Sequence, residues 1–354
     1  MKTFIARLLA LLVACSALGS AYADEYQVGT FYYPGWRDGQ PHNVSPTPWS
    51  AIKSYPEREP LLGWYDEGTE AVAKQQIDWM SQYGIKFVAY DWYWSKDNKV
   101  LLEHAIAAHM RAPNRDKVKF SLLWANHDGV PASRENFSRM VTYWAKYYFQ
   151  RPEFFRIDGK PVVFVFYADF LRTDAAKFGA TTKDLLDSAQ AIAQQYGLPG
   201  IYFVAGTGAS SPMIDSYARE MGYSALSAYN LHQGLYSPVQ SHNYAELDKA
   251  YQEHWGRFNA KGNLPTIFPM SAGWDKRPWG GSKDPLHDQS VSNVTQFEAH
   301  LVAAKAAMDK AKPDTPKMGV ICCWNEFGEG SYIEPTKKDG FGYLEKVKKV
   351  FGTP

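Results

Sequence analysis

Two glutamates three residues apart, Glu326 and Glu329, stand just beyond the last apolar run of the chain, Met318–Trp324. The run predicts a buried strand, so the residues that follow it are held on a rigid support at the rim of a core. Trp324 and Phe327 lie beside the two carboxyl groups, and neighbouring glycines let them converge. Cleavage of a sugar linkage requires one protonated carboxyl that acts as the acid and one ionised carboxyl that acts as base or nucleophile. Two carboxyls in different surroundings can fill these two roles. The pair therefore predicts catalysis on a sugar; the alternative is an acid pair that binds N–H groups at a helix start.

The composition narrows the ligands that these acids could act on. The 354-residue chain has 38 Lys and Arg against 37 Asp and Glu, a balance that argues against nucleic acid as the main partner. Its aromatic content is 15%, and many of the rings stand beside Asp, Asn, His or Gly. Aromatic planes flanked by hydrogen-bonding groups suit the faces and hydroxyl rims of sugar rings, although a large core also uses such residues. The predicted partner is a polysaccharide or oligosaccharide substrate.

The first residues carry the three-part pattern of a secretory signal. A basic start, the apolar stretch Leu8–Leu18 and the small-residue site Ala21-Tyr22-Ala23 predict cleavage after Ala23. The alternative is a lipid anchor, because the residues that end at Cys15 resemble a lipobox. We therefore expect a secreted or periplasmic protein, and no later segment is long and apolar enough to span a membrane.

The mature chain would keep two cysteines, Cys322 and Cys323, which are adjacent. Consecutive residues of a strand point to opposite faces, so an ordinary disulfide between them is not expected. We interpret both as small core residues rather than as a redox or metal-binding pair.

From residue 26 onward, short β-branched or aromatic runs alternate eight times with longer amphipathic segments. The runs that predict strands are Gln27–Tyr33, Lys86–Trp92, Lys119–Trp124, Pro161–Tyr167, Gly200–Val204, Ser224–Tyr229, Thr266–Met270 and Met318–Trp324. The segments that predict helices are Thr69–Tyr83, Leu101–Arg111, Ser133–Phe149, Thr182–Tyr196, Pro212–Met221, Tyr244–Ala260, Thr295–Lys310 and Tyr343–Val350. This count predicts a single (β/α)8 TIM barrel, with residues 1–23 as the signal peptide and 24–354 as one catalytic domain. The structural alternative is a doubly wound open sheet, which would gather its ligand at one switch point.

Barrel enzymes build their sites from residues at the carboxyl ends of the strands. Here nearly every strand end carries a polar or aromatic cluster, the end at 205–208 being the exception. The predicted substrate-binding residues are Tyr32, Tyr33, Trp36, Asp91, Trp92, Trp94, Trp124, Asn126, His127, Tyr167, Tyr229, His232, Trp274, Asp275, Arg277, Trp324 and Asn325. Weaker interpretations stay open for some of them: Asp91 could form a structural ion pair, Asn325 could cap a helix, and His127 and His232 could be passive.

The same clusters carry no recognisable metal or nucleotide signature. A metal site is conceivable only from scattered residues, namely Asp91, His127, Asp128, Asp169, His232 and Asp275, without a familiar ligand spacing. The glycine turn at 206–208 lacks the full dinucleotide fingerprint, so machinery for a nucleotide-activated donor is not visible. We therefore expect no metal and no organic cofactor.

The sequence around the glutamates resembles a known family. The residues Trp324-Asn325-Glu326-Phe327-Gly328-Glu329-Gly330, followed by Ile333-Glu334-Pro335 and Gly342-Tyr343-Leu344, are similar to the C-terminal signature of WbsX-type, glycoside hydrolase family 99-like domains. Weaker matches precede it in the same order and extend the resemblance over nearly the whole mature chain: Phe31-Tyr32-Tyr33-Pro34, Leu62-Gly63-Trp64-Tyr65-Asp66, Gln76 with Tyr83-Gly84-Ile85, Leu123-Trp124-Ala125-Asn126 and Asp158-Gly159-Lys160-Pro161. The stretch Gly273-Trp274-Asp275 with Arg277-Pro278-Trp279 is similar to the segment after the seventh strand of family 99 enzymes proper.

This resemblance implies a (β/α)8 barrel that acts as a retaining endo-α-mannosidase or endomannanase without a cofactor. It implies that Glu329 is the general acid/base and that Glu326 deprotonates the substrate 2-hydroxyl, whose oxygen then forms a 1,2-anhydro sugar. The sequence also departs from the pattern. Family 99 proper has Trp at the position of Phe327 and His at that of Gly328, and WbsX-type domains usually have an acid at that of His127. Mannose specificity is therefore not implied.

These observations predict a secreted glycoside hydrolase, endo-acting and retaining, that cleaves an α-linked polysaccharide as a monomer. One alternative is a glycosyltransferase or transglycosylase of polysaccharide biosynthesis, as WbsX-type domains are often labelled. Another is a glycan-binding barrel without catalysis. A secretory signal favours the hydrolase, because nucleotide sugars are scarce outside the cytoplasm.

Overall fold

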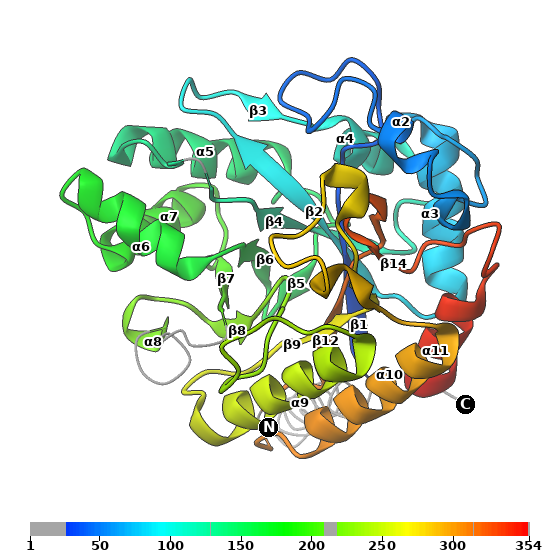
Figure 1. Cartoon of the computed structure of the whole chain (residues 1–354). Helices are drawn as coiled ribbons and strands as arrows, with labels where there is room; N and C mark the ends of the chain where they lie inside the picture. The colour runs from blue at the N-terminus through cyan, green and yellow to red at the C-terminus, as the bar shows by residue number, and fades with distance from the viewer. Residues whose placement is uncertain (1–25, 128, 209–217, 314, 353–354) are drawn as a thin grey trace, which may run out of the picture.

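Eight parallel strands form a barrel in the part of the chain that the computed structural model describes, residues 26–127, 129–208, 218–313 and 315–352 (Figure 1). A parallel bridge between Leu226 and Thr266 joins the two ends of the sheet. The predicted (β/α)8 barrel is therefore confirmed, and each predicted apolar run contributes one strand. In sheet order the strands are β8 (Ala225–Ser227), β7 (Tyr202–Gly206), β6 (Lys160–Val165), β4 (Lys119–Trp124), β2 (Phe87–Trp94), β1 (Gln27–Tyr32), β12 (Met318–Cys322) and β9 (Phe268–Ser271). The short strands β3 (Val100–Leu101) and β5 (Arg156–Ile157) pair antiparallel with β2 and β6.

Helices cover the outside of the barrel, as Figure 1 shows. Side-chain caps fix several of their starts, and Thr181 and Asn293 form capping boxes with a residue three positions on. No helix among the described residues is long and apolar enough to cross a membrane. The helices are α2 (Trp49–Ile52), α3 (Glu70–Gln82), α4 (His104–Arg111), α5 (Arg134–Tyr147), α6 (Ala168–Lys177), α7 (Thr182–Gln195), α8 (Ala218–Glu220), α9 (Tyr244–Lys261), α10 (Val294–Asp309) and α11 (Gly342–Phe351).

Helix α6 is absent from the elements expected from sequence. Its buried positions include Asp174 beside Leu171 and Ala175, so the apolar period of the segment is weak. The helix expected over 212–221 is described only from Ala218 onward. Residues 1–23, which carry the predicted signal peptide and Cys15, lie outside the described residues, so that prediction is not tested.

Alternation along the strands separates the barrel interior from the helix layer. In β2, Phe87 and Ala89 pack inside the barrel, whereas Tyr90 and Trp92 pack against the helices. Because successive side chains point to opposite faces, Asp91 is the next residue of β2 to point inward. The apolar interior thus gives way to a polar side chain where the strand approaches its end.

The structure joins the sulfur atoms of Cys322 and Cys323 in a disulfide, across a cis peptide bond. The expectation that these neighbours stay unpaired is therefore wrong. It assumed strand alternation through both residues, but β12 ends at Cys322 and Cys323 lies beyond the regular strand. Both side chains are fully buried in the barrel interior, as expected for small core residues.

Two hairpins after β9 and β12 lie over the C-terminal mouth of the barrel. In the first, β10 (Gly273–Trp274) pairs with β11 (Ser290–Val291). In the second, β13 (Asn325–Glu326) pairs with β14 (Ser331–Tyr332), and the 3-10 turn η5 (Phe327–Glu329) connects the two strands. Figure 1 shows the connection from β9 to α10, in yellow and gold, crossing in front of the barrel. The hairpins therefore place their side chains where the strand ends converge.

Candidate active site

A cavity of about 300 Å³ lies at the C-terminal mouth of the barrel. Its walls come from the ends of strands that are far apart in sequence, as expected for a barrel enzyme. The predicted site residues that line it are Tyr33, Asp91, His127, Tyr167, Tyr229, His232, Trp274, Glu326 and Glu329. The structure thus brings both candidate catalytic glutamates and part of the predicted binding set together. Their catalytic and binding roles stay predictions.

Tyr229 links two carboxyl groups of the cavity. Its hydroxyl lies 2.9 Å from Glu326 Oε1 and 3.1 Å from Asp91 Oδ2. A tyrosine hydroxyl has one proton, so it donates to one carboxylate, and the other carboxyl completes its hydrogen bond by donating a proton of its own. The remaining oxygens, Glu326 Oε2 and Asp91 Oδ1, are buried without a hydrogen-bond partner among the described residues. Both oxygens therefore have hydrogen-bonding capacity that the described residues do not use.

Burial raises the pKa of each of these carboxyl groups. It raises the pKa of Glu326 well above the usual value, and the negative charges of Glu329 and Asp91 raise it further. Burial raises the pKa of Asp91 as well, and it raises the pKa of Glu329 to about 7 while nearby Lys276 opposes the shift. Glu326 is 4% exposed. At neutral pH the cluster therefore holds protons that isolated carboxyl groups would have lost.

Two asparagines clamp the backbone of tyrosines that line the cavity. Asn325 accepts a hydrogen bond from the Tyr33 N–H at 2.9 Å and donates one to the Tyr33 carbonyl at 3.0 Å. Asn126 makes the same two bonds with Tyr167, both at 2.9 Å. Asn126 and Asn325 belong to the predicted substrate-binding set, but the structure places their amides in these clamps between neighbouring strands.

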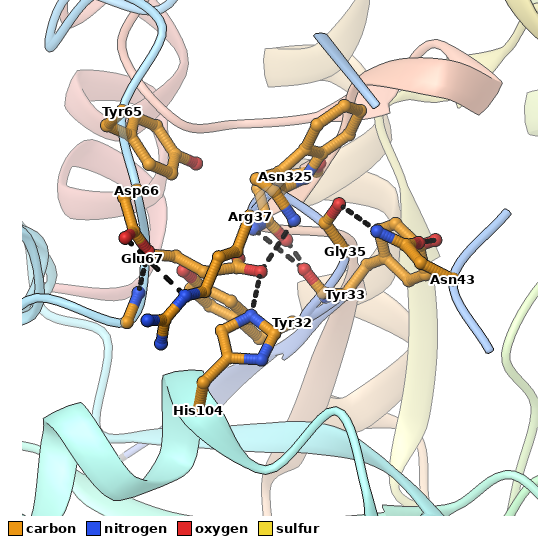
Figure 2. A network of polar contacts seen from close by, with 12 residues as sticks. Tyr32, Tyr33, Gly35, Arg37, Asn43, Tyr65, Asp66, Glu67, His104 and Asn325 are labelled. Carbon is orange, nitrogen blue, oxygen red and sulfur yellow. Dashed lines mark hydrogen bonds and ion pairs between the residues drawn. The ribbon is translucent and has the colours of Figure 1, made fainter. Parts of the chain in front are cut away.

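A buried carboxylate, Glu67, is connected to Asn325 through Trp36. Glu67 Oε1 accepts a hydrogen bond from the Trp36 N–H at 2.6 Å and lies 2.8 Å from His104 Nε2 (Figure 2). The indole N–H of Trp36 donates to the Asn325 carbonyl at 2.9 Å. Trp36, another predicted binding residue, therefore connects Glu67 to the strand that carries Glu326 and does not itself line the cavity.

Arg58 ties the two mouth hairpins together. It is 2% exposed, forms an ion pair with Asp275 and donates to the carbonyls of Asp275 at 3.1 Å and Phe327 at 2.7 Å. The Asp275 N–H donates to the Glu329 carbonyl at 2.6 Å. Burial alone would raise the pKa of Asp275, but Arg277 and Arg58 hold it below the usual value. Asp275 and Arg277, both predicted to bind substrate, thus lie in an ion-pair cluster that supports Glu329 and not among the cavity-lining residues.

The other predicted binding residues face the helices. Trp92, for example, donates its indole N–H to the Tyr148 hydroxyl at 3.0 Å. The predicted binding set includes aromatic side chains from both faces of the strand ends, whereas only alternate side chains of a strand point inward. The residues placed in this helix-facing core are Tyr32, Trp92, Trp94, Trp124 and Trp324.

Several residues that line the cavity are missing from the predicted set. Side chains two residues apart in a strand point to the same face, so Tyr93 shares the inward face of Asp91. By the same rule, Leu123 and Ala125 share a face. Thr207 follows a strand end that carries no conspicuous cluster, so the sequence offers little signal for it. The full group is Val44, Tyr93, Leu123, Ala125, Phe166, Thr207, Gly208, Asn230 and Trp279.

Trp279 reaches the cavity from the 3-10 turn η3 (Arg277–Trp279) because residue 328 is a glycine. A Cβ atom at Gly328 would collide with the Trp279 indole. The glycine that departs from the family 99 pattern therefore makes room for an aromatic wall of this cavity.

Among the described residues, no group of three or more His, Cys, Asp or Glu is arranged to hold a metal ion.

The architecture is similar to solved structures of glycoside hydrolases. A structure described as a glycoside hydrolase-like protein matches with a TM-score of 0.66 and 16% identity, over 93% of this chain and 95% of that one. A GH99 endo-alpha-mannosidase from Bacteroides thetaiotaomicron matches with a TM-score of 0.62 and 14% identity, over 91% and 96%. A family 1 β-glucosidase from Thermotoga maritima matches with a TM-score of 0.52 and 11% identity, over 93% and 98%. At these identities the likeness establishes the fold alone.

The sequence matches two curated proteins and one family model. Two proteins named Uncharacterized protein WxcX, from Xanthomonas campestris pv. campestris strains B100 and ATCC 33913, are each 22% identical over 318 residues. The match covers 82% of this chain and 42% of each relative, so the chain spans less than half the length of these relatives. A family model described as Glycosyltransferase WbsX matches residues 53–347, a range that holds both Asp91 and the glutamate pair. The chain therefore belongs to the WbsX family.

Proposed function

We propose that this WbsX-family protein is a glycoside hydrolase that cleaves an α-linked polysaccharide internally and with retention, using Glu326 and Glu329. The observation that carries the proposal is that three carboxyl groups, those of Asp91, Glu326 and Glu329, line one cavity, where burial raises the pKa of each. Acid–base cleavage of a glycosidic bond needs one protonated and one ionised carboxyl on the same substrate. The fold that this chain shares with glycoside hydrolases agrees with this chemistry.

In the proposed reaction, Glu329 donates its proton to the glycosidic oxygen as the bond from that oxygen to the anomeric carbon breaks. Glu326 takes the proton of the 2-hydroxyl, and the 2-oxygen forms a bond to the anomeric carbon, which gives a 1,2-anhydro sugar. Water then attacks the anomeric carbon as the bond from that carbon to the 2-oxygen breaks, ionised Glu329 takes a proton from that water, and Glu326 returns a proton to the 2-oxygen. Two displacements at one carbon retain its configuration. Direct attack by Glu326 would retain it too.

Substrate binding would leave Glu326 ionised and Glu329 protonated. A 2-hydroxyl that donates to Glu326 stabilises its carboxylate and lowers its pKa, whereas the glycosidic oxygen can accept only from protonated Glu329. The free oxygen of Glu326 is buried beside Tyr229, where it could receive that hydroxyl. Asp91, on the other side of Tyr229, is a second group that can keep a proton within the cluster.

The family name favours a second candidate function, a glycosyltransferase. A nucleotide-activated donor carries a diphosphate, which proteins bind with arginine, lysine, a metal ion or clustered N–H groups. The described residues that line this cavity include Asp91, Glu326 and Glu329 but no lysine or arginine. The carboxylates would repel a diphosphate. Transfer of a sugar from one glycan to another would use the same carboxyls, with a hydroxyl in place of water.

We propose further that residues 1–23 direct secretion to the periplasm or beyond, and that residues 24–354 act as a single-domain monomer. The mass of the protein recovered from its host checks the first point. A chain that begins at Asp24 is expected, whereas a chain that begins at a lipid-modified Cys15 would replace secretion with membrane anchoring.

Incubation with a panel of bacterial and fungal α-linked polysaccharides tests the activity. We expect oligosaccharides of mixed length from at least one polymer, with the freed anomeric centre in the α configuration at first appearance. Chromatography gives the product lengths, and NMR of the fresh products gives the configuration. Consumption of a nucleotide sugar without cleavage of any polymer would instead support the glycosyltransferase.

We expect the rate of cleavage to fall as the pH rises above neutral. Glu329 must carry a proton to act as the acid, and burial places its pKa at about 7. Below that pH the group is protonated, and each further pH unit above it removes the protonated form by about tenfold. A kcat profile reports the pKa of Glu329 in the substrate complex, where the charge of ionised Glu326 raises it further, so the fall begins at about pH 7 or above. The profile is measured over a range in which circular dichroism reports a folded protein. A rate that keeps rising to about pH 9 would contradict the role of Glu329.

A further inference from the structure

One wall of the cavity consists of a histidine and a tryptophan, with a second histidine behind them. His232 and Trp274 line it, and their rings meet edge to face with centroids 4.3 Å apart. Behind them lies His287, in the 3-10 turn η4 (His287–Gln289), fully buried and stacked on Trp274 with centroids 5.6 Å apart. His287 Nε2 lies 3.0 Å from His232 Nδ1. The proposed reaction uses neither histidine, so the reason for this arrangement lies elsewhere.

The surroundings of His287 favour one arrangement of protons. His287 Nδ1 lies 2.8 Å from the carbonyl oxygen of Ser241, and the Ser241 hydroxyl oxygen lies farther away, at 3.2 Å. A carbonyl can only accept, so Nδ1 carries the proton and Nε2 of the neutral ring carries a lone pair. This lone pair can accept a hydrogen bond only if His232 Nδ1 carries a proton as well. A neutral His232 with its proton on Nδ1 has an unprotonated Nε2.

We propose that His232 offers this unprotonated Nε2 to the cavity as a hydrogen-bond acceptor for a hydroxyl of the bound glycan, and that His287 is the positioning residue that fixes its tautomer. The identity of the ligand as a glycan rests on the proposed function. The hydrogen bonds that run from Ser241 through His287 to His232 do not depend on it. The pair therefore selects among substrates by requiring a donor at one place.

Both imidazoles are neutral where the enzyme is expected to work. Burial lowers the pKa of His232 to about 3, with His287 and Lys276 lowering it further, and burial lowers the pKa of His287 as well. The wall therefore gains no positive charge while Glu329 titrates. A neutral wall facing carboxyl groups accepts hydrogen bonds and attracts no anion. A sugar with a free hydroxyl at this subsite fits, whereas a uronate, a sulfate ester or an O-methyl ether there would leave the acceptors unpaired.

NMR of the histidine ring nitrogens tests the tautomer directly, on the full chain with isotopically labelled histidine. We expect both His232 and His287 to show a protonated Nδ1 and an unprotonated Nε2. His300 is an internal reference, because its Nδ1 lies 2.7 Å from Asp248 Oδ1 and its Nε2 accepts from the Ser271 N–H at 3.1 Å. Loss of signals in His232→Gln assigns the His232 ring. A proton on His232 Nε2 would overturn the inference.

The His287→Phe variant tests the positioning role. Phenylalanine keeps an aromatic ring near Trp274 but removes the acceptor for His232 Nδ1. We expect the His232 signals to move from a single tautomer to an average of two. An unchanged tautomer would show that His287 does not fix it. If this variant does not fold, the spectrum of the unaltered protein still decides the main point.

Affinity for the polysaccharide panel, measured in a Glu329→Gln background so that no cleavage occurs, tests the glycan contact. We expect His232→Phe to weaken binding by about tenfold, the effect of one lost hydrogen bond. His232→Gln should keep most of the affinity, because the Gln side-chain oxygen can reach the position of Nε2. His242→Gln is the matched control, since His242 pairs with Asp284 outside the cavity.

The outcomes separate the inference from the proposed function. Cleavage of a polymer combined with full binding by His232→Phe would overturn the inference and leave the function standing. A correct tautomer in a protein that neither binds nor cleaves any polymer would overturn the function and the glycan contact together. Weakened binding in His232→Phe, restored in His232→Gln, supports both.

Discussion

Glu329→Gln is expected to lower the rate of polysaccharide cleavage by about a thousandfold, within the range that general acid catalysis contributes. Glutamine has nearly the same shape, so the variant should bind substrate, but it cannot give a proton to the departing oxygen. The burial that raises the pKa of Glu329 to about 7 has no comparable cost for a neutral amide. The loss should therefore appear in kcat with little change in KM or in thermal stability.

Glu326→Gln is expected to cause a loss of similar size for a different reason. Glutamine cannot take the proton of the 2-hydroxyl, so the intramolecular attack on the anomeric carbon fails. An aryl glycoside of the cleaved oligosaccharide separates the two roles, because its leaving group needs no acid. Glu329→Gln should recover the rate of aryl release in the first displacement, although its second displacement still lacks the base, whereas Glu326→Gln should not recover that rate. Normal turnover of the polymer by either variant would contradict the assignment.

Glu334→Gln is the matched control for both glutamate variants. Glu334 is also a buried carboxyl close to the mouth, where it meets the Tyr65 hydroxyl at 2.7 Å and the Gln76 amide at 3.0 Å, but it does not line the cavity. Burial raises its pKa to about 8, so it is already neutral at pH 7 and loses no charge on substitution. We expect this variant to cleave at nearly the normal rate, which would show that removing a buried acid is not by itself damaging.

The strands of the barrel could be predicted because each is a short apolar run bounded by polar segments. The same logic located Glu326 and Glu329, since an acid directly after such a run must lie at the strand end. It failed for Trp92 and Trp124, which face helices, because the prediction did not apply alternation within the strand. Aromatic residues occur at strand positions that face the barrel interior and at positions that face the helices. Only the position of each residue within the strand alternation separates the two sets.

Contacts between loops could not be predicted in this way. His232 and His287 are 55 residues apart, and nothing in their spacing indicates that their ring nitrogens meet. Arg58 precedes the second strand and yet holds the carbonyl of Phe327, 269 residues later. Such contacts depend on how the loops fold over the mouth of the barrel. Loops lack the regular spacing of apolar residues from which helices and strands are predicted. The supports of the site are therefore less predictable than its carboxyl groups.

Arg58→Met is expected to destabilise the protein by about 3–5 kcal/mol, the cost of removing one partner from a buried ion pair. Methionine can fill much of the volume but leaves the carbonyls of Asp275 and Phe327 without their donor. Arg277 alone would then balance the charge of Asp275. Because the Asp275 N–H donates to the Glu329 carbonyl, the change should also disturb the turn η5, which carries Glu329, and slow the proposed cleavage. Chemical denaturation measures the loss in unfolding free energy, and a fall in Tm of roughly 4–7 °C should accompany it.

Arg37→Met separates this effect from the loss of an arginine as such. Arg37 and Asp66 also form an ion pair, at 3.6 Å, but their side chains are 41% and 45% exposed. An exposed pair is worth at most about 1 kcal/mol, because water screens the charges in the folded protein and solvates them when the pair is broken. We therefore expect Arg37→Met to unfold within about 1 kcal/mol of the unaltered protein and to keep its activity. Equal stabilities for the two variants would mean that the buried Arg58 ion pair does not hold the two hairpins together.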